Sequence, residues 1–351
     1  MSGSLRRYTK HHDVIGLWHV PNIKMRHPAV GAKPWYVRIN SDGLRDDRDF
    51  PKAKPKDKVR ITLLGDSFTF GHSVEVDERY SAKLEKHFGN IEILNFGLCS
   101  AGLDQHCLVY ENIAQAWESD ILMVNPYLNN VGRCQLTYHM FQGQQGQRKM
   151  SAKPYFELTG NDELVLRNVP VLRELSASDQ DRLSQAQSQR SVGRNVEADP
   201  QRRAVRYAKQ LVLERQLKYL AIKAFPIQPY PEYRSADAPE WRLARAILKR
   251  LRAASKQKTM VITPMPAWSS ILNPSLATYR ERYAEVHDPA NGIHVLDILP
   301  YFLELGFADR VRCMVSTRDA HYSAFGNSVV ARGVAAELEK TGLLDAVRSG
   351  A

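Results

Sequence analysis

The 351-residue chain has no apolar run long enough to cross a membrane as a helix, and it has only four cysteines. Because these cysteines show no spacing typical of a metal site, we expect reduced thiols and no metal or cofactor. The basic first ten residues are not followed by the apolar segment of a secretory leader. We therefore expect a cytoplasmic protein without stable membrane insertion. The cysteines are Cys99, Cys107, Cys134 and Cys313.

Acidic residues are outnumbered by basic ones, 38 to 49, which gives a formal net charge of +11. Such a balance can indicate a nucleic-acid partner, but the basic residues are dispersed and no nucleic-acid-binding motif accompanies them. We interpret them as solvated surface and expect no nucleic acid. Strongly salt-dependent binding of nucleic acid would favour the opposite view. The sequence leaves the oligomeric state open.

From residue 59 onward, apolar strands alternate with amphipathic helices. This alternation predicts a three-layer α/β/α, flavodoxin-like fold, in which helices cover both faces of a five-stranded parallel sheet. The predicted strands are Val59–Leu64, Ile91–Phe96, Asp120–Pro126, Thr259–Pro264 and Ile293–Ile298. The predicted helices are Val76–Phe88, Gly102–Trp117, Ala238–Ala254, Leu276–Val286 and Ser323–Leu338.

Two segments do not follow this alternation. Residues 1–58 are rich in Pro, Gly, Trp and charge, and they predict an N-terminal arm and linker with an edge strand at Trp35–Asn40. The main domain, residues 59–351, is interrupted by an insertion at about residues 131–231. The insertion is expected to contain a β-hairpin, a polar mobile segment and a helix, at Tyr155–Leu166, Ser176–Pro200 and Ala204–Phe225 respectively.

A candidate nucleophile follows the first strand of the main domain. Gly65 permits a tight turn, and Asp66 and Ser67 come next, before a helical pattern begins. This geometry presents a serine at the carboxyl edge of a parallel sheet, among backbone N–H groups that can bind an oxyanion. A serine that only caps a turn is the alternative. Two segments after other strands meet the same edge, namely Asn95–Gly102 and Tyr127–Asn130. A fourth segment, Ser316–Gly326, precedes the last helix and can lay an acid and a histidine over that edge.

Together, these four segments resemble the SGNH (GDSL) hydrolase family, and Ile39–Arg45 is similar to the lead-in of a bacterial esterase- and acyltransferase-like subgroup. The likeness covers about Ile61–Val131 and Lys258–Leu338. It implies that Ser67 is the nucleophile and His321 the base. It also implies that Asp319 orients His321.

The resemblance further implies an oxyanion hole. Its donors would be the backbone N–H of Ser67, a backbone N–H near Ser100 to Gly102, and the side-chain amide of Asn130. Ser100 stands where the family usually has Gly. The third segment ends Asn129-Asn130-Val131 in place of the usual Gly-x-Asn-Asp, so Asn129 is the alternative donor.

Other polar residues near these segments are interpreted as structural. His72 is expected to fill the rim of the site, and Cys99 is expected to be a small core residue rather than a nucleophile. Glu75 and Asp104 are expected to be ordinary first-turn helix acids. Four histidines are expected to be surface or arm residues rather than metal ligands, namely His11, His12, His19 and His27.

These features lead to the hypothesis of a serine-dependent hydrolase that cleaves a carboxylic ester through an acyl-enzyme. The resemblance implies an O-acyl group on a carbohydrate-like or lipid substrate. An O-acyltransferase is the alternative within enzymes, because it uses the same catalytic residues and a hydroxyl in place of water. A binding protein that keeps the fold without activity is the alternative from another class.

Overall fold

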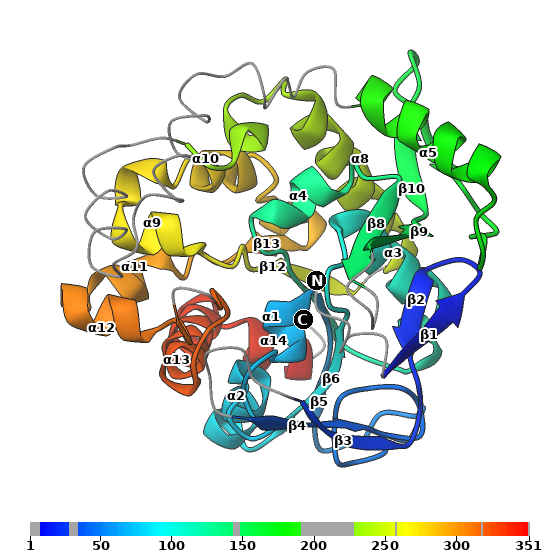
Figure 1. The fold of residues 1–351 in the computed structure, drawn as a ribbon. Helices are drawn as coiled ribbons and strands as arrows, with labels where there is room; N and C mark the ends of the chain where they lie inside the picture. Colours follow the sequence, from blue (N-terminus) through cyan, green and yellow to red (C-terminus); the bar gives the residue numbers. More distant parts are fainter. Residues whose placement is uncertain are drawn as a thin grey trace.

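A five-stranded parallel sheet forms the centre of the protein, as seen in a computed structural model (Figure 1). The structure describes residues 8–27, 34–142, 148–190, 228–256, 258–316 and 319–349. The strand order is β13–β12–β7–β5–β6, and every neighbouring pair is parallel. The predicted sheet is therefore confirmed. Its strands are β5 (Val59–Gly65), β6 (Ile91–Gly97), β7 (Ile121–Asn125), β12 (Thr259–Ile262) and β13 (Ile293–Val295).

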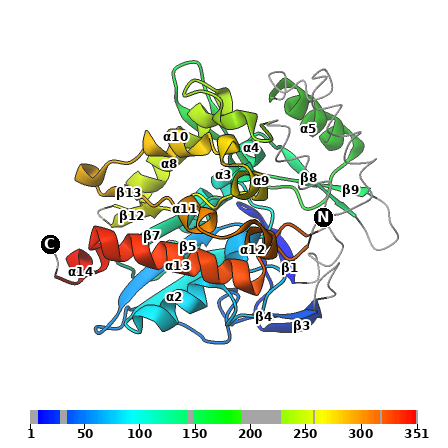
Figure 2. The ribbon, with the colours of Figure 1, turned by 90° about the vertical axis from the view of Figure 1, so that its left-hand side faces the viewer.

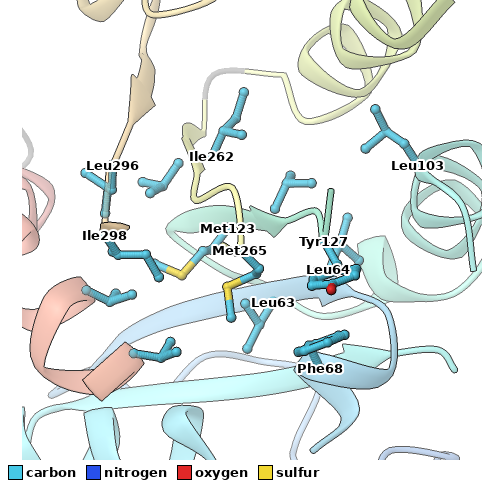
Figure 3. Close-up of a cluster of buried hydrophobic side chains, with 14 of the residues drawn as sticks. Leu63, Leu64, Phe68, Leu103, Met123, Tyr127, Ile262, Met265, Leu296 and Ile298 are labelled. Carbon is cyan, nitrogen blue, oxygen red and sulfur yellow. The ribbon is translucent and has the colours of Figure 1, made fainter. Parts of the chain in front are cut away.

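Helices cover both faces of this sheet, which confirms the three-layer prediction. In Figure 2, α2 and α13 lie below the sheet, and α3 and α8 lie above it. Every residue of β5, β6 and β7 is buried, as expected for parallel strands with two covered faces. Figure 3 shows Leu63, Met123 and Ile262 from three adjacent strands in one apolar cluster. The helices are α2 (Tyr80–Phe88), α3 (Leu103–Asn112), α8 (Pro239–Ala254) and α13 (Ala324–Thr341).

The short helix α1 (Ser67–Phe70) lies directly against the carboxyl ends of β5 and β6 because two glycines give it room. A Cβ at Gly65 would come within 2.0 Å of the hydroxyl of Thr69. A Cβ at Gly97 would come within 2.3 Å of the backbone nitrogen of Phe70. Both strands must therefore end in glycine for α1 to occupy this place.

The N-terminal arm forms two antiparallel hairpins, β1–β2 and β3–β4. Among the described strands, the predicted edge strand β4 pairs with β3 and not with the central sheet. Trp18 and Leu44 of the arm join the main core. Two of the arm histidines, His19 and His27, are buried within the arm. The strands are β1 (Thr9–His12), β2 (Gly16–His19), β3 (Ile23–His27) and β4 (Trp35–Ile39).

The insertion contains the predicted hairpin, now β10 (Tyr155–Leu158) and β11 (Leu164–Arg167), and a second hairpin of β8 (Tyr138–Gln142) and β9 (Arg148–Ala152). The expectation of a mobile segment is wrong for residues 177–190, which form helix α5 (Ala177–Arg190). One buried leucine, Leu183, anchors this helix. The predicted helix over residues 204–225 lies outside the described residues.

Several predicted elements are shorter in the structure. The helix expected from Val76 begins at Tyr80, because residues 75–79 form turns in which Arg79 Nε donates to the Val76 carbonyl at 3.1 Å.

None of the helices in the described ranges has the length and apolar character needed to cross a bilayer. The remaining α-helices are α4 (Asn129–Arg133), α9 (Trp268–Leu272), α10 (Tyr279–Ala284), α11 (Leu299–Leu303), α12 (Phe307–Arg312) and α14 (Leu343–Ser349). The 3₁₀ turns are η2 (Ala114–Ala116), η3 (Pro231–Tyr233), η4 (Pro274–Leu276) and η5 (Pro289–Asn291).

Candidate active site

Three residues predicted from distant parts of the sequence meet at the carboxyl edge of the sheet. His321 Nε2 lies 2.8 Å from Ser67 Oγ, although the two residues are 254 positions apart. His321 Nδ1 lies 2.5 Å from Asp319 Oδ1. Ser67 is 7% exposed, whereas a quarter of the His321 side chain is accessible. The His321 part of this line is therefore open to solvent, whereas Ser67 is nearly covered.

The protonation of this line follows from Asp319. Burial raises the pKa of its carboxyl group, but the hydrogen bonds from His321 and Ser73 outweigh burial and hold that pKa well below its usual range. Asp319 is therefore ionised near neutral pH and accepts the Nδ1–H of His321. The Nε2 lone pair of His321 then faces the hydroxyl of Ser67. This is the tautomer that a general base for a serine needs.

Asp66 holds the nucleophile helix in place. Its Oδ1 accepts the N–H of Phe68 at 3.0 Å, which caps the first turn of α1. Its Oδ2 accepts from Asn130 Nδ2 and from Arg133 Nη1, both at 2.9 Å. The fully buried carboxylate thus joins the nucleophile turn to helix α4 beside it.

The second segment combines an unusual backbone conformation with close packing. Ser100 has a φ of 69°, in the left-handed region where glycine is usual. Gly102 precedes α3, and its N–H donates to Gln105 Oε1 at a long 3.4 Å. A Cβ at Gly102 would lie 3.2 Å from the backbone and Cβ of Arg133. The segment therefore packs closely against α4.

Asn130 lies next to the nucleophile turn and is fully buried. Its Nδ2 donates to Asp66 Oδ2 at 2.9 Å and to the Ala101 carbonyl at 3.1 Å, and its Oδ1 accepts the N–H of Tyr127. Arg133 Nη1 donates to the same two acceptors, Asp66 and Ala101. Asn129 is partly exposed at the start of α4 and accepts a 3.3 Å contact from Asn130 Nδ2.

Aromatic rings form a wall beside the nucleophile. Phe68 stacks on Tyr127 with ring centroids 3.9 Å apart, and its ring lies 4.9 Å from those of His321 and Tyr322. Tyr230, at the far end of the insertion, brings its hydroxyl to 3.4 Å from that of Tyr127. One wall of the site therefore includes a residue of the insertion.

The N-terminal arm supports the end of the nucleophile helix. The buried guanidinium of Arg45 donates to the carbonyls of Phe70, Gly71 and Val74, at and just after the end of the nucleophile helix. The Tyr8 hydroxyl donates to Cys99 Sγ at 3.8 Å. Burial raises the pKa of the Cys99 thiol to about 12, which leaves it a poor nucleophile. All four cysteines are buried and free, in agreement with the prediction of reduced thiols.

The patterns in the sequence missed the contribution of Ser73 and Arg133. Ser73 Oγ donates to Asp319 Oδ2 at 2.5 Å across 246 positions, and nothing in its local sequence indicates that partner. His72, expected at the rim, is bonded to Ser73 and stacks on His321. Of the two acids interpreted as helix acids, Asp104 lies in the first turn of α3, whereas Glu75 lies in a turn before α2.

Among the described residues, one group of His, Cys, Asp or Glu side chains could share a metal ion. It consists of His72, Asp319 and His321, whose ligand atoms lie within 4.8 Å of one another. These side chains already bond to each other, to Ser67 or to Ser73. An ion at this place would therefore have to replace the hydrogen bonds that align His321 with Ser67.

No protein-family model and no curated protein sequence matches the chain. Solved structures are similar to it at low identity. A member of the lipolytic G-D-S-L family from Veillonella parvula is 13% identical, with 79% of this chain and 97% of that chain covered and a TM-score of 0.40. A family 3 carbohydrate esterase from Clostridium thermocellum is 9% identical, with 83% and 98% covered and a TM-score of 0.40. An acetyl xylan esterase is 11% identical, with 79% and 98% covered and a TM-score of 0.38.

Proposed function

We propose that the protein is a serine-dependent hydrolase of carboxylic esters, of the SGNH (GDSL) type, with Ser67, His321 and Asp319 as its catalytic residues. The observation that carries this proposal is the unbroken hydrogen-bonded line from Asp319 through His321 to Ser67. A serine, a histidine and an ionised acid in this order can activate a hydroxyl group for attack on an acyl carbon.

In the proposed mechanism, Ser67 Oγ attacks the carbonyl carbon of the ester while His321 Nε2 takes its proton. The resulting imidazolium is stabilised by the Asp319 carboxylate. Collapse of the tetrahedral intermediate breaks the bond to the alcohol oxygen, which leaves with the proton from His321. Water then attacks the acyl carbon while His321 Nε2 takes one of its protons. His321 passes that proton to Ser67 Oγ as the acyl–oxygen bond breaks, which releases the carboxylic acid and restores Ser67.

For the oxyanion hole, we propose the backbone N–H of Ser67, a backbone N–H near Ser100 to Gly102, and the side-chain amide of Asn130. The left-handed backbone of Ser100 supports a turn of the kind that aims an N–H at a bound oxygen. Arg133 bonds the same acceptors as Asn130, so it can keep them satisfied when the Asn130 amide turns toward an oxyanion.

The proposed substrate is an O-acyl group on a carbohydrate-like or lipid scaffold, and the proposed catalytic domain is residues 59–351 with the insertion at about 131–231. An O-acyltransferase, in which a hydroxyl compound replaces water, is the alternative for the second half-reaction. The contact of Tyr230 with Tyr127 supports a role of the insertion in selecting the acceptor, because it brings the insertion to the wall beside Ser67.

The test uses the purified full chain with a fluorophosphonate probe and an ester panel. We expect covalent labelling of the wild type at Ser67, and loss of both labelling and ester cleavage in Ser67→Ala. Ser328→Ala is the matched control, because Ser328 is an exposed serine whose hydroxyl donates within α13, to the Ala324 carbonyl. Wild-type hydrolysis by folded Ser67→Ala would refute the proposal. Adding alcohol acceptors to the ester assay separates transfer, which yields a new ester, from hydrolysis.

A further inference from the structure

Ser73 has a backbone conformation that is unusual for its residue type. Its φ is 73°, in the left-handed region that costs free energy for any residue with a Cβ. Such conformations persist where surrounding contacts maintain them, and they are often found at functional sites. Ser73 lies six positions after the proposed nucleophile. Its side chain points to the other end of the catalytic line, at Asp319.

The contacts of Ser73 extend the catalytic line by two residues. Ser73 Oγ lies 2.5 Å from Asp319 Oδ2, the oxygen that does not contact His321. His72 Nδ1 lies 2.8 Å from the same Ser73 Oγ. The Asp319 carboxylate is therefore held from both sides, by the imidazole of His321 on Oδ1 and by the hydroxyl of Ser73 on Oδ2.

Counting hydrogens fixes the direction of each bond. The ionised Asp319 carboxylate only accepts hydrogen bonds, so Ser73 must give it the single hydrogen of its hydroxyl group. Ser73 Oγ can then only accept from His72, whose Nδ1 must carry a proton. The network therefore runs in one direction, from His72 Nδ1–H to Ser73, and from Ser73 O–H to Asp319.

The ring of His72 also contacts the proposed base. It stacks on His321 with centroids 4.4 Å apart and an interplanar angle of 29°. On its other side, His72 meets the rings of Trp35 and His27 edge-on, at 5.1 and 5.2 Å. Burial, with a further contribution from His321, lowers the pKa of His72 well below its ordinary value, so its ring is neutral. A neutral ring can cover His321 without repelling an imidazolium.

We propose that Ser73 and His72 are positioning residues for the proposed hydrolase reaction, and that they fix the Asp319 carboxylate so that it can hold His321 against Ser67. This inference rests on the proposed function, because it concerns the same catalytic line. Neither side chain touches the reacting atoms. Their effect reaches Ser67 only through Asp319 and, for His72, through the stack on His321.

Two variants of Ser73 separate this role from a purely structural one. Ser73→Gly removes the hydroxyl but suits a left-handed backbone, whereas Ser73→Ala removes the hydroxyl and keeps the unfavourable Cβ. We expect both variants to lower kcat by about 10- to 100-fold with little change in KM. This is the rate loss that corresponds to removing one hydrogen bond to a charged group. The Gly variant should be the more stable of the two in thermal unfolding. If Ser73 contributed only to stability, the loss of kcat would parallel the loss of unfolding temperature. The more stable Ser73→Gly would then keep the wild-type kcat.

Two variants of His72 separate its hydrogen bond from its ring. His72→Asn keeps an N–H donor near the place of Nδ1 and loses the stack, whereas His72→Phe keeps the stack and loses the donor. We expect His72→Phe to lower kcat by about tenfold, the lower end of the range for Ser73, and His72→Asn to lower it less. A larger loss in His72→Asn would assign the effect to the ring and overturn the hydrogen-bonded network.

The same assays distinguish failure of this inference from failure of the proposed function. If Ser67→Ala is inactive but Ser73→Gly turns over at the wild-type rate, the positioning role is refuted and the serine mechanism stands. If folded Ser67→Ala cleaves esters as fast as the wild type, the proposed function is refuted and the inference with it. The expected result is an inactive Ser67→Ala and a folded, slow Ser73→Gly with an unchanged KM.

Discussion

Mild acid should unfold this protein because three histidines are buried in their neutral form. His19, His106 and His139 are 1%, 1% and 6% exposed. Burial lowers the pKa of His19 and of His106 from 6.5 to about 4, and that of His139 to about 3. Among the described residues, neither ring nitrogen of His106 has a hydrogen-bond partner, and burial outweighs the attraction of the Asp66 carboxylate for a charged ring.

The sign and size of the effect follow from proton linkage. Each folded-state pKa lies below the unfolded value, so the unfolded chain binds more protons between about pH 6.5 and 4. The stabilisation is complete above pH 6.5 and is lost as the pH falls through this window. At pH 5 each histidine lowers the free energy of unfolding by roughly 2 kcal/mol, and the three together lower it by roughly 6 kcal/mol. That loss is comparable to the whole stability of an ordinary domain, about 5–15 kcal/mol.

The assay is urea unfolding between pH 8 and pH 5, with His106→Leu as the informative variant. Leucine fills a similar volume without polar atoms, so we expect the slope of stability against pH to fall by about 1.4 kcal/mol per pH unit, the share of one histidine. His87→Gln is the matched control, because half of the His87 side chain is exposed. An unchanged slope in His106→Leu, with wild-type stability at pH 8, would refute the assignment of a neutral buried ring.

Three further predictions concern contacts around the site. Lys153→Met removes the partner of the fully buried Asp104 and should cost about 3–5 kcal/mol in urea unfolding, with much of it restored when Asp104 is also replaced by Leu. Asn130→Ala should lower turnover of an activated ester by ~10²-fold and the free energy of unfolding by about 1–3 kcal/mol. Asn129→Ala should change both only slightly. The reverse pattern would assign the oxyanion donor to Asn129. Arg45→Met should lower the unfolding temperature sharply, because it leaves several buried carbonyls unpaired, and a normal melting curve would contradict that role.

The central sheet could be predicted from sequence because its signal is local. β5, β6 and β7 are short apolar runs with turn residues after them, and burial on both faces makes such runs nearly continuous. Helix α5 was missed because its signal is weak. It has one buried apolar residue, Leu183, and its other anchors are polar, such as Arg190 Nη2 to the Cys134 carbonyl at 2.8 Å. A polar segment held in this way reads as unstructured.

At the candidate site, too, residues with a local sequence signal could be predicted and residues that depend on tertiary contacts could not. Ser67, Asp319 and His321 could be proposed because each follows a recognisable strand or precedes a recognisable helix, and parallel strands bring such ends to one edge. Ser73 could not, because its role depends on a left-handed φ and on a partner 246 positions away. Tertiary contacts of single side chains leave no periodic trace in a sequence.

The contacts of the N-terminal arm have a consequence for folding during synthesis. The arm is synthesised before the segments that it contacts. The Ile15 carbonyl accepts from Gln105, 90 positions later, and the Asp13 carbonyl accepts from the N–H of Val171. Such non-local contacts form late, because the entropy cost of closing a long loop must be met before the contacts contribute any stabilising free energy. On a growing chain, Trp18 therefore stays exposed until at least the strand of its stacking partner Phe96 has been made, and in that interval it is a surface that a chaperone can hold.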